Sequence, residues 1–356
     1  MAGGGTGGHL YPALAIADEI RKLSPVSEFL FVGTKGKIEE RVVPQRGYRF
    51  RRIWISGFHR RPTLGNLLFP VKLVVSLVQS FFLIKEFQPD VVIGTGGYVC
   101  GPVLSVASWL RIPTVVHESN SYPGFTTRLL AGRVSKVFIA YEVTKRWLKR
   151  ADRVELVGSP TREVLGSVSS DDGRKFFSLD PRQRTILVFG GSLGATSINT
   201  AILTMIDEFV ATGIQLIWQT GQADFDRVQK AVRGKKIGWV GPFIENMEYA
   251  YAAAEVVVCR SGALTIAELT RVGLPAILIP YPHAAADHQT LNAQTLVAAG
   301  AALVVKDAEI PQHLKTEILG LLADQRRRNT MATESKHLGR PEAGKQIAQK
   351  ALELIR

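Results

Sequence analysis

One short pattern recurs along the chain and limits its possible folds more than any other feature. An apolar run at 256–258 passes through small residues around Gly262 into a stretch of helical spacing at 264–272. A second apolar run at 276–280 leads to a second helical stretch at 287–299. Parallel strands joined by helices form doubly wound sheets, whose loops meet at the carboxyl edge of the strands. The sequence therefore predicts an α/β fold with two ligand-binding turns at one edge.

The chemistry of these two turns indicates a nucleotide sugar. Helix N-termini present unpaired N–H groups and the positive end of the helix dipole, which suits a phosphate. Glu268 lies one turn inside the first of these helices. Its carboxylate repels phosphate but accepts hydrogen bonds from two sugar hydroxyls, as the acidic residue of dinucleotide folds does for a ribose.

The same pattern predicts two domains. A buried-type strand at 185–189 runs into the glycine turn 190–195, and the chain opens on another glycine turn followed by a helix. A chain of 356 residues is long enough for two domains of ordinary size. We expect two Rossmann-like doubly wound domains, 1–158 and 159–340, with a hinge at 158–162. The amphipathic stretch 341–356 is expected to be a C-terminal helix.

The opening glycines form a weak dinucleotide pattern. Gly3, Gly5 and Gly8 satisfy G-x-G-x-x-G, but the strand expected at 29–32 ends in Gly33-Thr34-Lys35, which has no acidic residue. NAD binding is therefore disfavoured. Only Met1 and Ala2 precede the glycines, where a parallel sheet normally has a central strand. We expect either that the start lies upstream or that this loop lacks support, at a cost to stability and activity.

His9 directly follows the last glycine of this loop. Histidine ordinarily titrates near neutral pH, which suits a general base. The alternative is a loop or helix-cap histidine whose ring nitrogens are both satisfied. The residues alone leave both open.

Two further loops are expected at the same edge of the first sheet. Strand 91–93 meets the glycine loop 94–98, and strand 114–116 leads into the polar loop 117–124. Glycine loops and helix N-termini bind anions through backbone N–H groups. This edge could therefore hold an anionic group such as a diphosphate.

The positive charge is concentrated in the first half of the chain. Residues 1–158 hold 22 Lys and Arg against 11 Asp and Glu, a net +11, while residues 159–356 hold 22 against 20, a net +2. A basic half indicates an anionic partner, either nucleic acid or lipid. The alternative is a solvated basic face that only promotes solubility.

A basic and apolar stretch at 58–86 favours lipid. Its first part mixes cations with large apolar residues, as an interfacial membrane contact does; the residues assigned to this patch are Arg60, Arg61, Leu64, Leu67, Leu68, Phe69 and Lys72. The alternative is a buried helix with basic flanks. The apolar run 73–84 is too short and too polar to span a bilayer.

The composition indicates a globular protein of a reducing compartment. Cys100 and Cys259 lie in apolar surroundings and have neither disulfide nor metal-ligand spacing. No signal peptide precedes the glycines, so the cytoplasm is the default. We expect no metal, since no carboxylate pair lies in a predicted site loop, and no cofactor.

Six motifs in order along the chain together resemble one family. They are GGTGGH at 4–9, GTGGY at 94–98, HESN-x-x-PG at 117–124, GGSLGA at 190–195, RSGALTIAEL at 260–269 and ADHQTLNA at 286–293. The set resembles the MurG family, glycosyltransferases of the GT-B fold that take part in peptidoglycan synthesis. The resemblance implies transfer of N-acetylglucosamine from UDP-N-acetylglucosamine to an undecaprenyl-diphosphate-linked muramyl pentapeptide, lipid I, giving lipid II. It also implies that the C-terminal helix crosses back onto the first domain.

The resemblance implies a role for each matching residue. Glu268 would hold the ribose, Ile244 the uracil through its backbone, and Gln289 the transferred sugar. The other donor-side positions are Arg162 and Ser192 at the diphosphate, the backbone of Ala263 and Leu264 at the phosphates, and Thr6, Gly7, Gly8 and Asn120 at the cleft. His9 is the candidate base. The acceptor diphosphate side would comprise Gly5, Gly96, Gly97, Tyr98, His117 and Glu118.

The implied location is the cytoplasmic face of the cell membrane, with cell-wall synthesis proteins as possible partners and no nucleic acid. The chain has Ser119 where the family usually has Gln, and Ser159 where it often has Asn. Both are neighbours of the matched positions, so we expect catalysis to survive.

Two other functions stay open. The first is a UDP-sugar epimerase, or a transferase with another lipid or small-molecule acceptor; the acceptor-side loops 94–98 and 117–124 argue against an epimerase. The second is a non-catalytic nucleotide-sugar-binding or scaffolding subunit at the membrane. Retention of His9 with the complete donor set argues against it.

Overall fold

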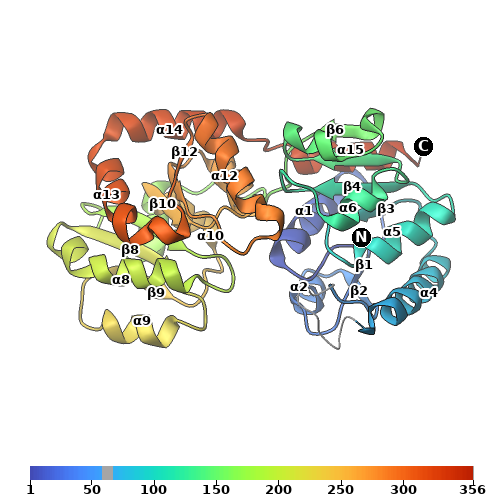
Figure 1. The fold of residues 1–356 in the computed structure, drawn as a ribbon, viewed down its shortest axis with the longest axis horizontal. Coiled ribbons are helices and arrows are strands. Elements are labelled where there is room, and N and C mark those ends of the chain that lie inside the picture. The colour runs from blue at the N-terminus through green and yellow to red at the C-terminus, as the bar shows by residue number, and fades with distance from the viewer. Residues whose placement is uncertain (58–66, 356) are drawn as a thin grey trace. The chain divides into compact units, whose positions relative to one another are not determined.

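The computed structural model describes residues 1–57 and 67–355, which form two compact units (Figure 1). Unit 1 comprises Met1–Arg162 together with Arg340–Arg356, and unit 2 comprises Glu163–Gly339. The C-terminal segment thus belongs to the unit that contains the N-terminus. Its helix α15, Ala343–Glu353, packs against α1, Gly7–Leu23.

Unit 1 is built on parallel strands. Strands β1 (Leu30–Gly33) and β2 (Arg49–Arg52) pair with each other, and a second group has the order β3-β4-β5-β6. The bounds of this group are Val92–Gly94, Thr114–Glu118, Lys136–Ile139 and Val154–Leu156.

The first residues of the chain join these two groups of strands. Ala2 forms parallel bridges with both Val32 of β1 and Gly94 of β3. The Met1 ammonium donates to the Leu30 carbonyl at 2.8 Å, and the Ala2 N–H donates to the Ile93 carbonyl at 2.7 Å. The glycine loop therefore starts from a segment that is hydrogen-bonded to strands on both sides. Met1 and Ala2 supply the support that we expected to be missing.

A cavity of about 460 Å³ lies between β1 and β3, next to Met1. Its lining includes Leu30, Ile84, Phe87, Ile93 and Leu352. In a parallel strand the N–H and the carbonyl of one residue point to the same side. The carbonyls of Leu30 and Ile93 bond the N-terminal segment, so the N–H groups of both residues face the cavity. The cavity has the apolar walls and backbone groups that a strand needs.

A chain extended before Met1 by four valine or isoleucine residues is therefore expected to be more stable. The extension would pair with both flanking strands and bury apolar side chains, for a net gain of roughly 1–3 kcal/mol after the entropy of ordering. Calorimetric unfolding of the extended chain measures the gain. An extension of four Gly and Ser residues is the control, and equal stability of the two extensions would show that no strand enters the cavity.

Helices cover both faces of the unit 1 sheet, because successive strand residues point to opposite sides. Ile93, Val115 and Phe138 pack with α1 and α15, while Val92, Val116 and Val137 pack with α4 (Phe69–Phe87) and α5 (Cys100–Trp109). Among the described residues of this unit, the remaining α-helices are α2, Ile38–Gln45, and α6, Phe125–Leu130. Cys100 and Cys259 are both buried and form no disulfide.

Unit 2 has one parallel sheet in the order β12-β11-β10-β7-β8-β9. In chain order the strands are β7 Arg184–Phe189, β8 Ile214–Gln219, β9 Gly238–Gly241, β10 Val256–Cys259, β11 Ala276–Leu278 and β12 Ala302–Val304. The chain leaves β7 toward β8 on one side and later returns to place β10 on the other. The carboxyl ends of β7 and β10 are thus a topological switch point, where open α/β sheets bind ligands.

Helices also cover the unit 2 sheet. The core on one face gathers α8 (Thr196–Ala211) and α13 (Ile310–Ala323) over alternate residues of β7 and β10. The other α-helices are α7 Ser170–Phe176, α9 Phe225–Ala231, α10 Met247–Ala253, α11 Ala263–Val272, α12 His288–Ala298 and α14 Gln325–Leu338. The doubly wound fold predicted for both halves is confirmed.

Strands β2, β5 and β12 have little signal in the sequence. Strand β2 reads Arg-Phe-Arg-Arg, and only Phe50 is partly buried in it. Its polar composition hides a strand at the edge of the sheet. Strands β5 and β12 have only four and three residues, and so their apolar runs are too short to stand out in the sequence.

Candidate active site

His9 lies in the first turn of α1, and its ring is held by the neighbouring glycine loop. The ring Nδ1 lies 3.0 Å from the Thr95 carbonyl, and the Thr95 hydroxyl donates back to the His9 carbonyl at 2.7 Å. A carbonyl only accepts, so Nδ1 carries the proton and Nε2 is the basic nitrogen of the neutral ring. This is the tautomer that a general base requires.

The glycine loop that follows β3 approaches His9 closely. A β-carbon at Gly96 would lie 2.7 Å from His9 Nδ1, and one at Gly97 would lie 2.8 Å from the Gly4 carbonyl. Both residues also have positive φ, 100° and 82°. Only glycine at these positions lets the two loops touch and keeps the His9 ring in place.

A buried glutamate that the sequence analysis missed supports the first glycine loop. Glu39 of α2 is 1% exposed, and its carboxylate accepts the Gly5 N–H at 3.0 Å and the Thr34 N–H at 3.1 Å. The Thr34 hydroxyl lies 3.3 Å from the Tyr98 hydroxyl. Gly5, which we expected at the acceptor diphosphate, therefore already uses its N–H on Glu39. The only signal for this role in the sequence is an acidic residue five positions after Thr34.

His117 and Glu118 lie at the end of β4 and shape the following loop from inside. The Glu118 carboxylate is 3% exposed and accepts the N–H groups of Asn120 at 3.0 Å and Gly124 at 2.9 Å. His117 is fully buried, with Nε2 2.9 Å from the Gly158 carbonyl and Nδ1 3.4 Å from the Ser119 hydroxyl. Burial lowers the pKa of His117 to about 4, so the ring stays neutral. Both side chains, expected on the acceptor side, are thus engaged in holding the loop.

The other positions assigned to unit 1 lie at the start of α1 and at the end of the unit. Thr6 precedes α1, and its carbonyl accepts the His9 and Leu10 N–H groups. Thr6 and Gly8 are exposed, Gly7 begins α1, and Arg162 is the last residue of the unit before the chain enters unit 2.

In unit 2 the turn between β7 and α8 presents backbone to solvent. Gly191 and Gly194 have φ of 90° and 80°, and Ser192 is exposed. The N-cap residue Ala195 has no side chain that could cap the helix. The first N–H groups of α8 therefore point out of the turn unmasked by a cap, as in anion-binding helix N-termini.

The turn between β10 and α11 has the same construction. Ala263 and Leu264 are the first residues of α11, and its N-cap is Gly262, again without a side-chain cap. Glu268 lies one turn further and is 6% exposed. Its Oε2 accepts a hydrogen bond of 3.0 Å from the Tyr251 hydroxyl of α10, which fixes the carboxylate.

Gln289 and Ile244 are held by neighbours within unit 2. The Gln289 side-chain oxygen accepts the Tyr281 N–H at 2.9 Å, and its carbonyl accepts the Ser261 hydroxyl at 2.8 Å. The Ile244 N–H donates to the Gln219 side chain at 2.9 Å. Both predicted ligand positions thus lie in segments of fixed backbone.

Arg260 is a second residue whose role only the structure shows. Arg260 is 9% exposed. Its guanidinium pairs with Asp307 at 2.5 Å and donates to the Ser197 hydroxyl at 2.9 Å and to the Pro280 carbonyl at 3.1 Å. It ties the end of β10 to the start of α8 and to the chain beyond β11. The two candidate phosphate turns are therefore cross-linked by a buried charge.

In the described residues no group of three or more His, Cys, Asp or Glu side chains is arranged to hold a metal ion. No helix in the described part of the chain is long and apolar enough to cross a membrane.

The comparisons with known proteins agree with this geometry. The glycosyltransferase family 28 N-terminal domain matches residues 1–139, and the family's C-terminal domain matches residues 185–347. A relative from Flavobacterium psychrophilum is 43% identical over 100% of this chain and 97% of its own length, and one from Salinibacter ruber is 42% identical over 99% and 96%. Both are named UDP-N-acetylglucosamine–N-acetylmuramyl-(pentapeptide) pyrophosphoryl-undecaprenol N-acetylglucosamine transferase. The chain belongs to the MurG family.

Solved structures agree with this assignment. MurG of Acinetobacter baumannii superposes with a TM-score of 0.77 at 25% identity, covering 99% of this chain and 98% of that one. A UDP-N-acetylglucosamine 2-epimerase of Neisseria meningitidis shares the fold alone, at 15% identity and a TM-score of 0.68 over 96% of each chain. As a MurG family member the chain is a glycosyltransferase of the GT-B fold, and the resemblance of its six motifs is confirmed.

Proposed function

We propose that the chain transfers N-acetylglucosamine from UDP-N-acetylglucosamine to the 4-hydroxyl of the muramyl sugar of lipid I, giving lipid II with inversion at the anomeric carbon. Relatives named for this transfer match the chain over its full length. The structural observation that carries the proposal is the His9 ring, held by the Thr95 carbonyl with Nε2 as its basic nitrogen. A subunit that only bound the nucleotide sugar would not need that tautomer.

The chemistry is a direct displacement. His9 Nε2 takes the proton of the acceptor hydroxyl, whose oxygen forms a bond to the anomeric carbon. The bond from that carbon to the β-phosphate oxygen breaks, and UDP leaves with the electron pair. General-base catalysis of this kind contributes roughly 10²–10⁴-fold.

The departing diphosphate needs compensation for its charge. The N-termini of α8 and α11 offer backbone N–H groups without a side-chain cap. We assign Ser192, Ala263, Leu264 and Arg162 to the phosphates. No step of the proposal passes through a metal or a cofactor.

The rest of the donor is assigned to unit 2. Glu268 accepts the two ribose hydroxyls, Ile244 contacts the uracil through its backbone, and Gln289 binds the hydroxyls of the transferred sugar. The acceptor diphosphate is assigned to the glycine loop at Gly96 and Gly97 with Tyr98, and to the loop shaped by His117 and Glu118. Thr6, Gly7, Gly8 and Asn120 of unit 1 are also assigned to UDP-N-acetylglucosamine.

The lipid tail of the acceptor requires unit 1 to meet the membrane, and α4 has a surface for it. Five apolar side chains of the α4 region are at least half exposed at helical spacing, and we name them the α4 stripe: Leu67, Val71, Val74, Val78 and Phe82, with 75%, 51%, 61%, 50% and 65% exposure. An exposed apolar stripe on a basic domain matches an interfacial contact with anionic lipid. We therefore place the chain at the cytoplasmic face of the membrane.

The residues that we assign to this contact differ from those of the predicted patch. Leu67 and Leu68 are exposed, whereas Phe69 packs partly into the core. Lys72 donates to the Ser56 hydroxyl at 3.0 Å and lies 5.9 Å from the Trp54 ring. Arg60, Arg61 and Leu64 lie outside the described residues. The stripe also extends further along α4 than the sequence analysis expected.

Replacing Val74 and Phe82 together by serine is expected to weaken binding to anionic vesicles at least tenfold. Each side chain contributes about 1.5–3 kcal/mol when fully buried from water, and partial insertion retains part of that. Co-sedimentation with phosphatidylglycerol vesicles measures the loss. Val26→Ser, at an equally apolar and 90% exposed position, is the control; equal binding by the control and the double variant would refute the contact.

UDP release from UDP-N-acetylglucosamine, measured with and without a lipid I analogue, tests the transfer itself. We expect release only with the acceptor present, and a disaccharide product. Acceptor-independent turnover of the sugar would instead indicate an epimerase, and binding without turnover a scaffolding role.

A further inference from the structure

We propose that Gln219 is a positioning residue for the donor nucleotide, which sets the spacing between the phosphate turn of β7 and the segment assigned to the base. The inference rests on the proposed function. Gln219 is the last residue of β8 and is 3% exposed. It was not among the residues that the sequence singled out.

The Gln219 amide joins two segments that follow different strands. Its Nε2 donates to the Gly191 carbonyl in the turn after β7 at 2.8 Å, and its Oε1 accepts the Ile244 N–H after β9 at 2.9 Å. An amide has both a donor and an acceptor at a fixed separation, which no carboxylate or hydroxyl offers. The spacing of the two segments is therefore set by one rigid group.

Backbone atoms of the residues after Gln219 contact the same two segments. The Thr220 and Gly221 N–H groups donate to the Gly241 and Pro242 carbonyls at 3.0 and 3.1 Å. On the other side, a β-carbon at Gly194 would lie 2.1 Å from the Thr220 carbonyl oxygen. Both segments thus lie directly against the turn that begins with Gln219.

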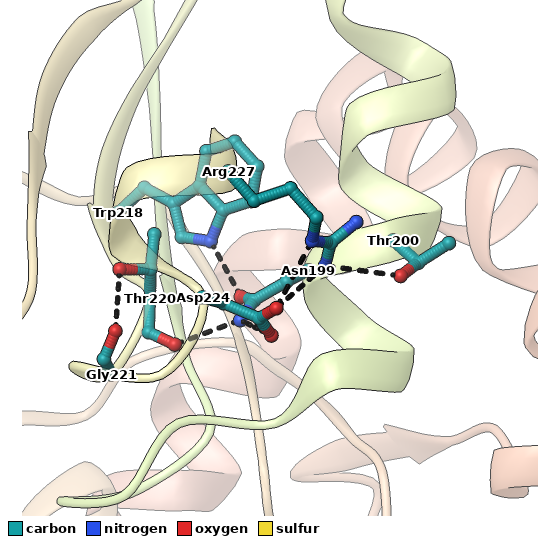
Figure 2. A network of polar contacts seen from close by, with 7 residues as sticks. All are labelled: Asn199, Thr200, Trp218, Thr220, Gly221, Asp224 and Arg227. Atoms are coloured by element: carbon teal, nitrogen blue, oxygen red, sulfur yellow. Dashed lines mark hydrogen bonds and ion pairs between the residues drawn. The ribbon is translucent and has the colours of Figure 1, made fainter. Parts of the chain in front are cut away.

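A buried polar network holds this turn in place (Figure 2). Asn199 of α8 donates to the Thr220 carbonyl at 2.8 Å and to Asp224 at 2.9 Å, and accepts from the Trp218 indole at 3.0 Å. Arg227 donates to Asp224 at 2.9 Å. The buried members of this network, Asn199, Trp218, Thr220 and Asp224, all have partners, so the turn is a rigid base for Gln219.

The geometry also limits how the base is recognised. Since the Ile244 N–H is engaged by Gln219, the Ile244 carbonyl is the group that we assign to the uracil N–H. Loss of the Gln219 side chain would release Ile244 and Gly191 together. Donor binding would then weaken while the proton transfer at His9, in unit 1, would not change.

The test compares Gln219→Ala with Gln215→Ala. Gln215 is a matched control because it lies on the same strand, is also 3% exposed, and bonds the Asp180 carbonyl at 2.8 Å and the Asp180 N–H at 3.1 Å. We expect both variants to unfold at lower temperature than the parent. Only Gln219→Ala should raise KM for UDP-N-acetylglucosamine and Kd for UDP, by about tenfold, with kcat within threefold.

Gln219→Glu separates the hydrogen bond to Gly191 from the one to Ile244. It also provides a test if the alanine variant fails to fold. Its carboxylate still accepts the Ile244 N–H but cannot donate to the Gly191 carbonyl. Calorimetry should show uridine binding nearly as in the parent and UDP binding weakened. Unchanged UDP binding in both Gln219 variants, or an equal loss in Gln215→Ala, would overturn the inference alone. Absence of UDP binding by the parent would overturn the proposed function with it.

Discussion

His9→Ala is expected to lower kcat by roughly 10²–10⁴-fold, the range for loss of a general base. The Thr95 carbonyl fixes the Nδ1 proton, so the acceptor hydroxyl would lose its base at Nε2. His9 is assigned to the acceptor hydroxyl and not to the donor, and so KM for UDP-N-acetylglucosamine should stay within about threefold. Steady-state rates of UDP release with a lipid I analogue measure both constants.

Two further variants make this result specific. His337→Ala removes a histidine whose side chain is 69% exposed on α14, and it should leave kcat unchanged. His9→Asn keeps a donor near the Nδ1 position for the Thr95 carbonyl but has no basic nitrogen, so it should be nearly as slow as His9→Ala. Turnover near the parent value in either His9 variant would remove His9 from the mechanism.

Glu268→Ala is expected to lower kcat/KM by roughly 10²-fold or more, mostly through KM for the donor. The buried carboxylate is held by Tyr251 and would accept two ribose hydroxyls, and hydrogen bonds to a charged group contribute about 1.5–3 kcal/mol each. Initial rates over a range of donor concentrations measure the change.

The ligand itself supplies the control for Glu268. The parent should discriminate against the 2′-deoxyribose form of the donor, and Glu268→Ala should lose most of that discrimination because its partner is gone. Tyr251→Phe removes the hydrogen bond to Oε2 and should produce a smaller loss of the same kind. Equal discrimination by the parent and Glu268→Ala would place the ribose elsewhere.

The fold could be predicted from the sequence because its strands carry their own signal. The buried strands β7 and β10 are continuous β-branched and apolar runs, as expected where both faces of a parallel sheet are covered. Strand β2 could not be predicted, since three of its four residues are arginines exposed at an edge. Burial, and not the pairing itself, makes a strand visible in the sequence.

The site could be predicted where it consists of backbone. Glycine turns at 94–98 and 190–195 mark close approach, and their positive φ angles confirm the physical reason for glycine. Supporting side chains could not be predicted. Glu39 bonds Gly5 across 34 positions and Gln219 bonds Ile244 across 25, and such partners depend on which strands become neighbours.

The sequence by itself determined the order of strand, turn and helix, and so which turns would lie at the carboxyl edge of each sheet. Only the tertiary structure decided the chemical state of those turns. Thr95 lies 86 positions from His9, and it selects the basic nitrogen of the ring because the sheet brings the two loops together. His117, the other histidine assigned to the site, is instead buried and kept neutral by desolvation. The role of a histidine depends on the residues around it, and these residues can be distant in the sequence.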